Sequence, residues 1–264
     1  MTQIRQRTLI FIPTYNEAAN LSPLYLELEG LGLGCDYLFL DDNSPDGTGR
    51  IIDDLANGNP RVHSIHRAGK LGIGSAHAEG ISWAYRSGYE VLMTMDCDFT
   101  HSPACISSFL EHAADHHVVV GSRFLRSDSL PGWSLFRKTL TYGGHIMTRL
   151  LLGMPLDATG AFRLYRLDRI PQSVFDLVSS RGYSFFFESL YILWLNGASI
   201  MQIPISLPAR TQGHSKMRVK DALQSIGVLF EMFQRRLLRP ASLSSAVPCA
   251  PITGRTGENR REEA

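Results

Sequence analysis

The chain has 264 residues and a formal net charge of +1, which is long enough for one large α/β domain but does not exclude two. Its 44% hydrophobic and 19% charged residues are typical of a globular protein, and the near-neutral charge gives no indication of a nucleic-acid partner. No apolar run approaches the roughly 20 residues of a membrane-spanning helix, and the N-terminus lacks a secretory signal. The four cysteines form no CxxC pair, so we expect a reduced, cytoplasmic protein without structural zinc.

Short apolar runs alternate with amphipathic segments through the first half of the chain. We expect strands at Thr8–Pro13, Asp36–Asp41, Arg61–Arg67, Tyr89–Asp96 and His117–Ser122. Helices are predicted between them at Glu17–Gly30, Thr48–Ala56, Gly74–Gly88 and Pro103–Ala114. Repeated βα units predict a doubly wound α/β fold, a mostly parallel sheet with helices on both faces and ligands at the carboxyl ends of the strands.

The second half is less regular. The predicted elements there are helices at Ser134–Leu152, Tyr183–Asn196 and Asp221–Arg239, and strands at Phe162–Arg166 and Ser199–Leu207. After Pro240 the composition turns to Ser, Pro, Gly and charge, which predicts a disordered tail. We therefore expect a single domain over residues 1–239, with a basic amphipathic helix near 218–239, and a tail over 240–264.

Polar turns follow the first four predicted strands, at Pro13–Glu17, Asp41–Gly49, His66–Ala76 and Met95–Pro103. Because the carboxyl ends of parallel strands meet at one edge of the sheet, these turns can line one crevice. The third is glycine-rich, but Lys70 is followed by Leu71 instead of the Ser or Thr of a P-loop, and the dinucleotide pattern fails at His77. Arg67 and Lys70 can still bind phosphate ahead of a helix N-terminus.

Asp96 and Asp98 stand one residue apart at the end of the fourth apolar run. In a strand both carboxylates point the same way, and such a pair needs a cation or a shared proton. Mg²⁺ and Mn²⁺ take oxygen ligands of this kind together with substrate phosphates. For the DxD spacing alone, loop carboxylates that cap the helix at Pro103 are the commoner explanation. The position after a central buried strand favours the metal.

Seven segments together resemble the motifs of family 2 glycosyltransferases with the GT-A fold. The resemblance is strongest to the branch of dolichol-phosphate and polyprenol-phosphate mannose synthases. It is carried by PTYNEAANL, DDNSPDGT, RAGKLGIGSAHAEG, MDCDFTHSP, GSRF, FRLYR and RTQGHSK, which span about Leu9 to Met217. The resemblance implies a metal-dependent, inverting transfer of a hexose, first of all mannose from GDP-mannose, to a polyprenyl or dolichyl phosphate.

The resemblance also implies roles for individual residues. Donor binding is assigned to Pro13, Tyr15, Glu17, Asp42, Lys70 and Asp96, and Mg²⁺ or Mn²⁺ binding to Asp96 and Asp98. A cationic acceptor pocket would contain Arg123, Arg137, Arg210, Ser215 and Lys216, and the catalytic set is Asp98, Arg123, Arg210 and Lys216. Asp46 is equally explained as a β-turn residue. Glu188 is either a functional carboxylate or the partner of an arginine.

Two further functions stay open. A sugar-hydroxyl acceptor would need a carboxylate base, whereas a prenyl phosphate is already anionic and needs only cationic partners. The chain has no QxxRW motif of processive polysaccharide synthases, which also favours the phosphate acceptor. Gly160-Ala161 replaces the Ser-Gly expected before Phe162-Arg163, so the resemblance is weaker on the acceptor side. A non-catalytic nucleotide-sugar-binding protein is the third alternative.

The segment from Arg210 to Arg239 has seven basic and two acidic residues. A basic amphipathic helix can lie on an anionic bilayer surface, and it can equally dock on the protein core with its basic face in water. Since the expected acceptor is a lipid, we predict peripheral association with the cytoplasmic face of a membrane.

Overall fold

The computed structural model describes residues 6–208 and 219–252. This part of the chain forms a seven-stranded sheet with the strand order β3-β2-β1-β4-β6-β5-β7. The strands are β1 (Thr8–Thr14), β2 (Asp36–Asp41), β3 (Val62–His66), β4 (Val91–Thr94), β5 (Val118–Ser122), β6 (Arg163–Arg166) and β7 (Ile200–Pro204). Neighbouring strands are parallel except around β6, which runs antiparallel to both β4 and β5. The predicted mostly parallel sheet is confirmed.

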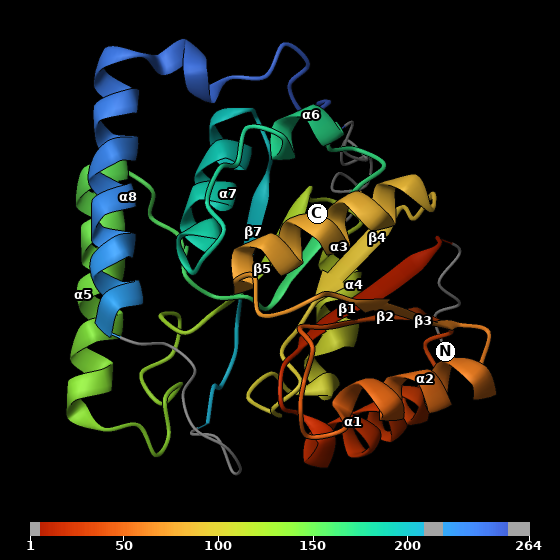
Figure 1. Ribbon diagram of the computed structural model, residues 1–264. Helices are drawn as coiled ribbons and strands as arrows, with labels where there is room; N and C mark the ends of the chain where they lie inside the picture. Colours follow the sequence, from red (N-terminus) through yellow and green to blue (C-terminus); the bar gives the residue numbers. More distant parts are fainter. Residues whose placement is uncertain (1–5, 209–218, 253–264) are drawn as a thin grey trace, which may run out of the picture.

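Helices cover both faces of the sheet (Figure 1). One face carries α1 (Ala18–Gly30), α2 (Thr48–Gly58) and α4 (Ile106–His112), the last preceded by a 3-10 turn at Pro103–Cys105. The other face carries α3 (Ile73–Arg86), α6 (Gln172–Phe175) and α7 (Ser184–Leu195). Outside α7, the long helices α5 (Leu135–Leu152) and α8 (Val219–Leu238) lie side by side and form a further layer (Figure 1).

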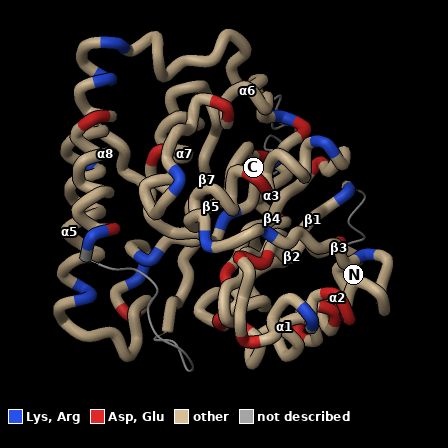
Figure 2. Tube along the Cα trace, viewed as in Figure 1, with Lys and Arg blue, Asp and Glu red and all other residues tan. Residues whose placement is uncertain are grey.

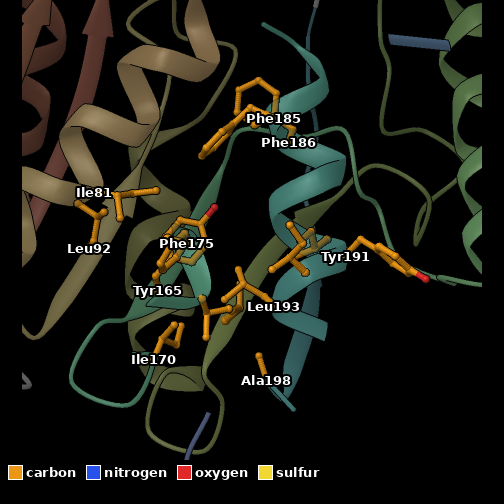
Figure 3. Packing of buried hydrophobic residues seen from close by; sticks show 14 of the residues in the cluster. Ile81, Leu92, Tyr165, Ile170, Phe175, Phe185, Phe186, Tyr191, Leu193 and Ala198 are labelled. Carbon is orange, nitrogen blue, oxygen red and sulfur yellow. The ribbon is translucent and has the colours of Figure 1, made fainter. Parts of the chain in front are cut away.

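Side-chain alternation along the strands builds two cores. In β1, Leu9 and Phe11 pack into the core under α3 and α7, whereas Ile10 and Ile12 pack under α1. Successive strand residues point to opposite faces, so a strand covered on both sides has to be apolar nearly throughout. Figure 3 shows the α7 side of this packing, with Ile81 and Leu92 facing the helix and Tyr191 projecting on its opposite side.

The structure differs from the sequence-based expectation in three places. Residues 103–112 form a 3-10 turn and a short helix instead of one helix to Ala114. The strand predicted at residues 162–166 inserts antiparallel between β4 and β5, a position that its apolar pattern does not encode. The disorder predicted from residue 240 onward is wrong for residues 240–252, where a second 3-10 turn (Pro240–Leu243) packs against α8.

Two apolar side chains and one asparagine hold residues 240–252 against the core. Leu243 and Cys249 are buried. Asn196, at the end of α7, donates to the Leu243 carbonyl (2.9 Å) and accepts from the amides of Ser245 (2.6 Å) and Cys249 (2.9 Å). The average composition of this segment is dominated by its Ser and Pro residues. It therefore does not reveal that a few apolar residues anchor the segment to the core.

Gly80 is required by a close helix–strand contact. A Cβ atom at this position of α3 would lie 2.5 Å from the Phe11 ring, so we expect Gly80→Ala to destabilise the fold by about 1–3 kcal/mol. Urea unfolding followed by circular dichroism measures this loss. Gly143→Ala is the matched control, since Gly143 lies within α5 with no neighbouring atom within 4 Å and alanine there should stabilise by up to about 1 kcal/mol. Equal stability changes in the two variants would contradict the packing argument.

Candidate active site

Strained backbone concentrates in the loops that follow the parallel strands. Among the residues that the structure describes, the non-glycine residues with positive φ are Asn16 (54°), Asn43 (58°) and Phe99 (59°). They follow β1, β2 and β4, which are neighbours in the sheet. Left-handed backbone is costly for a residue with a side chain, above all for phenylalanine. Strain gathered at one edge of a sheet is typical of a functional site.

The loops after β1 and β2 form one hydrogen-bonded unit. Three successive amides of the first loop donate to side chains of the second: Asn16 N to Ser44 Oγ (2.9 Å), Glu17 N to Thr48 Oγ1 (2.9 Å) and Ala18 N to Asp46 Oδ2 (3.1 Å). Partial burial opposes the charge of Asp46, but the hydrogen bonds from Thr48 and Ala18 hold its pKa below the ordinary value. Asp46 is therefore more than a turn residue, because it also joins the two loops.

Asp42 and Arg67 form a buried ion pair between the loops after β2 and β3. Burial raises the pKa of Asp42, and the Arg67 guanidinium opposes that rise. Arg67 also donates from Nη1 to the Ser75 hydroxyl (2.8 Å), in the first turn of α3. The structure thus gives Arg67 a partner on each side, and Asp42 a fixed orientation.

Lys70 and Tyr15 come together from the third and the first loop. The ammonium group of the exposed Lys70 lies 4.4 Å from the centroid of the Tyr15 ring, close enough for a cation–π contact. Glu17, in the same first loop, is buried and accepts from Asn20 Nδ2 (2.8 Å). Pro13 lies at the end of strand β1, immediately before Thr14. The side chains predicted to bind the donor therefore belong to adjoining loops.

Asp98 and Asp96 lie in the loop after β4. The Asp98 carboxylate is buried and accepts from the Thr100 amide (3.2 Å) and the Thr100 hydroxyl (2.5 Å). The more exposed Asp96 is held through its backbone amide, which donates to His101 Nδ1 (2.9 Å). The His101 ring stacks on Phe162 of the neighbouring segment, with centroids 4.7 Å apart. Thr100 and His101 thus orient the two aspartates.

The two carboxylates suit a hard divalent cation that completes its coordination elsewhere. Within residues 6–208 and 219–252 there is no cluster of three or more His, Cys, Asp or Glu side chains placed to hold a metal ion. Mg²⁺ and its relatives are commonly held by one or two carboxylates together with water and substrate phosphates. Asp96 and Asp98 match that donor set, so the predicted assignment to Mg²⁺ or Mn²⁺ stays compatible with the loop.

Arg123, the first residue after β5, is joined to Asp157. Its amide and its Nε both donate to Asp157 Oδ2 (2.9 Å each), and Nη2 donates to Asp157 Oδ1 (2.5 Å) and to Thr159 Oγ1 (2.6 Å). Although burial opposes the Asp157 charge, Arg123 keeps the pKa of this carboxyl below its usual range. The sequence does not reveal this pair, since its members are distant in the chain and separated by α5.

The remaining residues assigned to the acceptor pocket are only partly described. Arg137 lies on α5 with its guanidinium 3.6 Å from the centroid of the Trp133 ring. Arg210, Ser215 and Lys216 fall outside the described residues. The acceptor and catalytic roles of Arg123, Arg137, Arg210, Ser215 and Lys216 therefore stay predictions.

The mostly parallel sheet, with polar loops gathered at its carboxyl edge, is shared with known glycosyltransferases. Mannosyl-3-phosphoglycerate synthase from Rubrobacter xylanophilus superposes with a TM-score of 0.63 at 14% identity, over 89% of this chain and 75% of that one. Glucosyl-3-phosphoglycerate synthase from Mycobacterium tuberculosis, solved with Mn²⁺, UDP and phosphoglyceric acid, gives 0.58 at 17% identity over 93% and 81%. The fold is that of a GT-A glycosyltransferase.

Sequence comparison gives the family. Residues 9–170 match the model of glycosyl transferase family 2. The chain is 37% identical over 215 residues to polyprenol monophosphomannose synthase of Mycolicibacterium smegmatis, covering 80% of this chain and 81% of that one. It is 36% identical over 212 residues to undecaprenyl-phosphate mannosyltransferase of Micrococcus luteus, covering 80% and 87%. The chain belongs to glycosyl transferase family 2 and is a glycosyltransferase, as its motifs predict.

Proposed function

We propose that this enzyme transfers mannose from GDP-mannose to a polyprenyl phosphate, with Mg²⁺ or Mn²⁺ and with inversion at the anomeric carbon. The observation that carries the proposal is the 36–37% identity, over 80% of the chain, to two enzymes named for mannose transfer to polyprenol or undecaprenyl phosphate. The family model spans all four strand-end loops, because it matches residues 9–170, which supports a shared donor.

The geometry is suited to displacement of a nucleoside diphosphate. Asp96 and Asp98 would hold the cation, which when bound supplies positive charge for the departing diphosphate. Lys70, whose ammonium group lies beside the Tyr15 ring, adds a positive charge within the loop that follows β3. The Asp42–Arg67 pair fixes a carboxylate next to the expected nucleotide. An acceptor phosphate attacks as an anion, so the mechanism needs no strong general base.

The proposal is tested by incubating the purified enzyme with radiolabelled GDP-mannose and undecaprenyl or dolichyl phosphate, with and without EDTA. We expect label in the organic extract, lost with EDTA and restored by excess Mg²⁺ or Mn²⁺. Label only in a water-soluble product would indicate a hydroxyl acceptor instead, and donor binding without transfer would indicate a non-catalytic protein. A panel of GDP- and UDP-sugars in a thermal-shift assay identifies the donor independently of the acceptor.

The exposed face of α5 and α8 supports action at a membrane surface. Most of the exposed large hydrophobic side chains lie on these two helices: Leu135, Phe136, Leu140, Tyr142, Ile146, Leu150, Leu223, Ile226, Phe230, Leu237 and Leu238. Basic residues lie near both ends of α8 (Figure 2). In the described part of the chain, none of the helices combines the length and hydrophobicity needed to cross a bilayer. We propose that this face lies on an anionic membrane, with the apolar side chains inserted and the basic ones at the headgroups.

Leu140→Glu is expected to weaken vesicle binding at least tenfold, because it removes one inserted side chain worth about 1.5–3 kcal/mol and adds a negative charge. Co-sedimentation with vesicles of phosphatidylglycerol and phosphatidylcholine at low salt measures the partition. Leu26→Glu is the control, since Leu26 is similarly exposed but lies on α1, on the other side of the sheet. Failure of the wild-type protein to co-sediment, or equal losses in the two variants, would rule out this face as the contact.

A further inference from the structure

Glu188 is the one charged residue in the sequence of α7, SFFFESLYILWL. Its side chain is buried, with 1% of its surface exposed, between the phenylalanines that pack on α3 and the residues that face α8. A buried carboxylate is costly unless its oxygens are hydrogen-bonded or paired. The contacts that compensate Glu188 therefore indicate what this residue holds in place.

The compensating contacts come from the loop between α6 and α7. Oε1 accepts from the Ser179 amide (3.1 Å) and the Ser179 hydroxyl (2.9 Å), and Oε2 accepts from the Ser180 amide (2.8 Å). Arg235 of α8 lies 3.8 Å from Oε1. Both oxygens of Glu188 thus fix the backbone of the loop at residues 179–182, which we call the clamp loop.

The other side of the clamp loop contacts the start of α3. The carbonyl of Arg181 accepts from the amide of Ser75 (2.9 Å), an amide in the first turn of that helix. The residue that precedes α3 is Gly72, which has no side chain to cap the helix. The clamp loop, a distant segment of the same chain, therefore supplies the acceptor that a Ser, Thr or Asp side chain at the N-cap would normally provide.

The approach of the two backbones explains both glycines at this position. A Cβ on Gly72 would lie 2.6 Å from the Arg181 carbonyl oxygen, and one on Gly74 would lie 2.5 Å from the Gly182 carbonyl oxygen. Gly72 also has a φ of 102°, which other residues rarely adopt. The glycine-rich motif of this sequence is thus explained by contact with the clamp loop.

We propose that Glu188 is a positioning residue for the donor-binding loop at residues 66–76. The Glu188 carboxylate accepts hydrogen bonds from the clamp loop. The Arg181 carbonyl of that loop accepts from the Ser75 amide. The Ser75 hydroxyl in turn accepts from Arg67, which forms an ion pair with Asp42. Lys70 lies in the same loop, shortly before α3 begins at Ile73. A pocket of about 270 Å³ separates the clamp loop from α8, so the loop has room to move once its anchor is lost. This inference rests on the proposed use of a nucleotide-sugar donor.

Glu188→Gln tests the inference, because the amide keeps the shape but loses the charge and one acceptor. We expect roughly fivefold weaker binding of GDP with Mn²⁺ in calorimetry and a similar rise in the donor's KM, which corresponds to about 1 kcal/mol. The acceptor's KM should change little, and Glu188→Ala should show the larger effect. Glu231→Gln is the matched control, since Glu231 lines the same pocket from α8, and it should behave as the wild type.

The outcomes separate this inference from the proposed function. If the wild-type enzyme binds GDP and transfers label while Glu188→Gln keeps its donor KM, the positioning role is refuted and the function stands. A lower melting temperature with both KM values unchanged would show a purely structural carboxylate and also refute it. If the wild-type enzyme binds neither GDP nor UDP with Mn²⁺, both the proposed function and this inference are refuted.

Discussion

Replacement of Asp98 by asparagine is expected to lower kcat/KM about a thousandfold or more, because stabilisation of the leaving group by a cation is worth several kcal/mol. The amide is nearly isosteric and can still accept from Thr100, so the fold should remain. Organic-extractable label from GDP-mannose measures the activity. A second readout does not depend on turnover: Mn²⁺ should raise the thermal midpoint of the wild-type protein in the presence of GDP, but not that of the variant.

Asp115→Asn is the matched control for this experiment. Asp115 is an exposed aspartate in the turn between α4 and β5, away from the loops at the carboxyl ends of β1 to β4, and its replacement should leave both readouts unchanged. Full activity of Asp98→Asn would contradict the metal assignment. Lost activity together with an unchanged Mn²⁺ effect would assign Asp98 another role in the reaction.

The second large effect is expected at Asp157. Replacing it by asparagine leaves the buried guanidinium of Arg123 without its countercharge, which should destabilise the fold by about 3–5 kcal/mol. Urea unfolding measures the change. Asp128→Asn is a close control, because Asp128 also accepts hydrogen bonds from Nε and Nη2 of an arginine, Arg126. That pair lies on the exposed surface, where it contributes little to stability. Similar losses in the two variants would show that burial does not set the strength of the pair.

The Asp157 pair also gives a pH dependence. The pKa of Asp157 is lower in the folded protein than in the unfolded chain, so its stabilisation is fully present above the unfolded pKa of about 3.9. It is lost as the pH falls through the folded pKa, where the folded carboxyl also takes up its proton. The stability difference between the wild-type protein and Asp157→Asn should therefore shrink as the pH falls below about 4.

The strand-end loops could be predicted because their signals are local. An apolar run predicts a strand, and the polar residues after it predict a loop. Parallel strands then bring these loops together at the carboxyl edge of the sheet. The DxD motif, with one residue between its aspartates, therefore appears in the structure where the sequence places it, after β4. The Gly72 region shows the limit. Its glycines suggest a phosphate loop, whereas the contact that requires them comes from residues 179–182.

Side-chain pairs between separate elements were not predictable, for a physical reason. Arg123 with Asp157, and Glu188 with Ser179 and Ser180, depend on how α5 and α7 pack, and no periodicity in either segment encodes that packing. The ordered segment after residue 240 is similar, because Leu243 and Cys249 gain their stability from a surface formed elsewhere in the chain. Composition reports whether a segment can form a core of its own, not whether it joins an existing one.

The antiparallel position of β6 divides the molecule in a way that bears on how its specificity can change. The four strands that precede the proposed donor loops are adjacent in the sheet and consecutive in the chain, from Thr8 to Thr94. The other three come from separate stretches divided by α5 and α7. The proposed nucleotide side is thus built from one uninterrupted block of the chain, whereas the opposite side is assembled from separate segments. Grafting segments between relatives should therefore alter acceptor choice far more readily than donor choice.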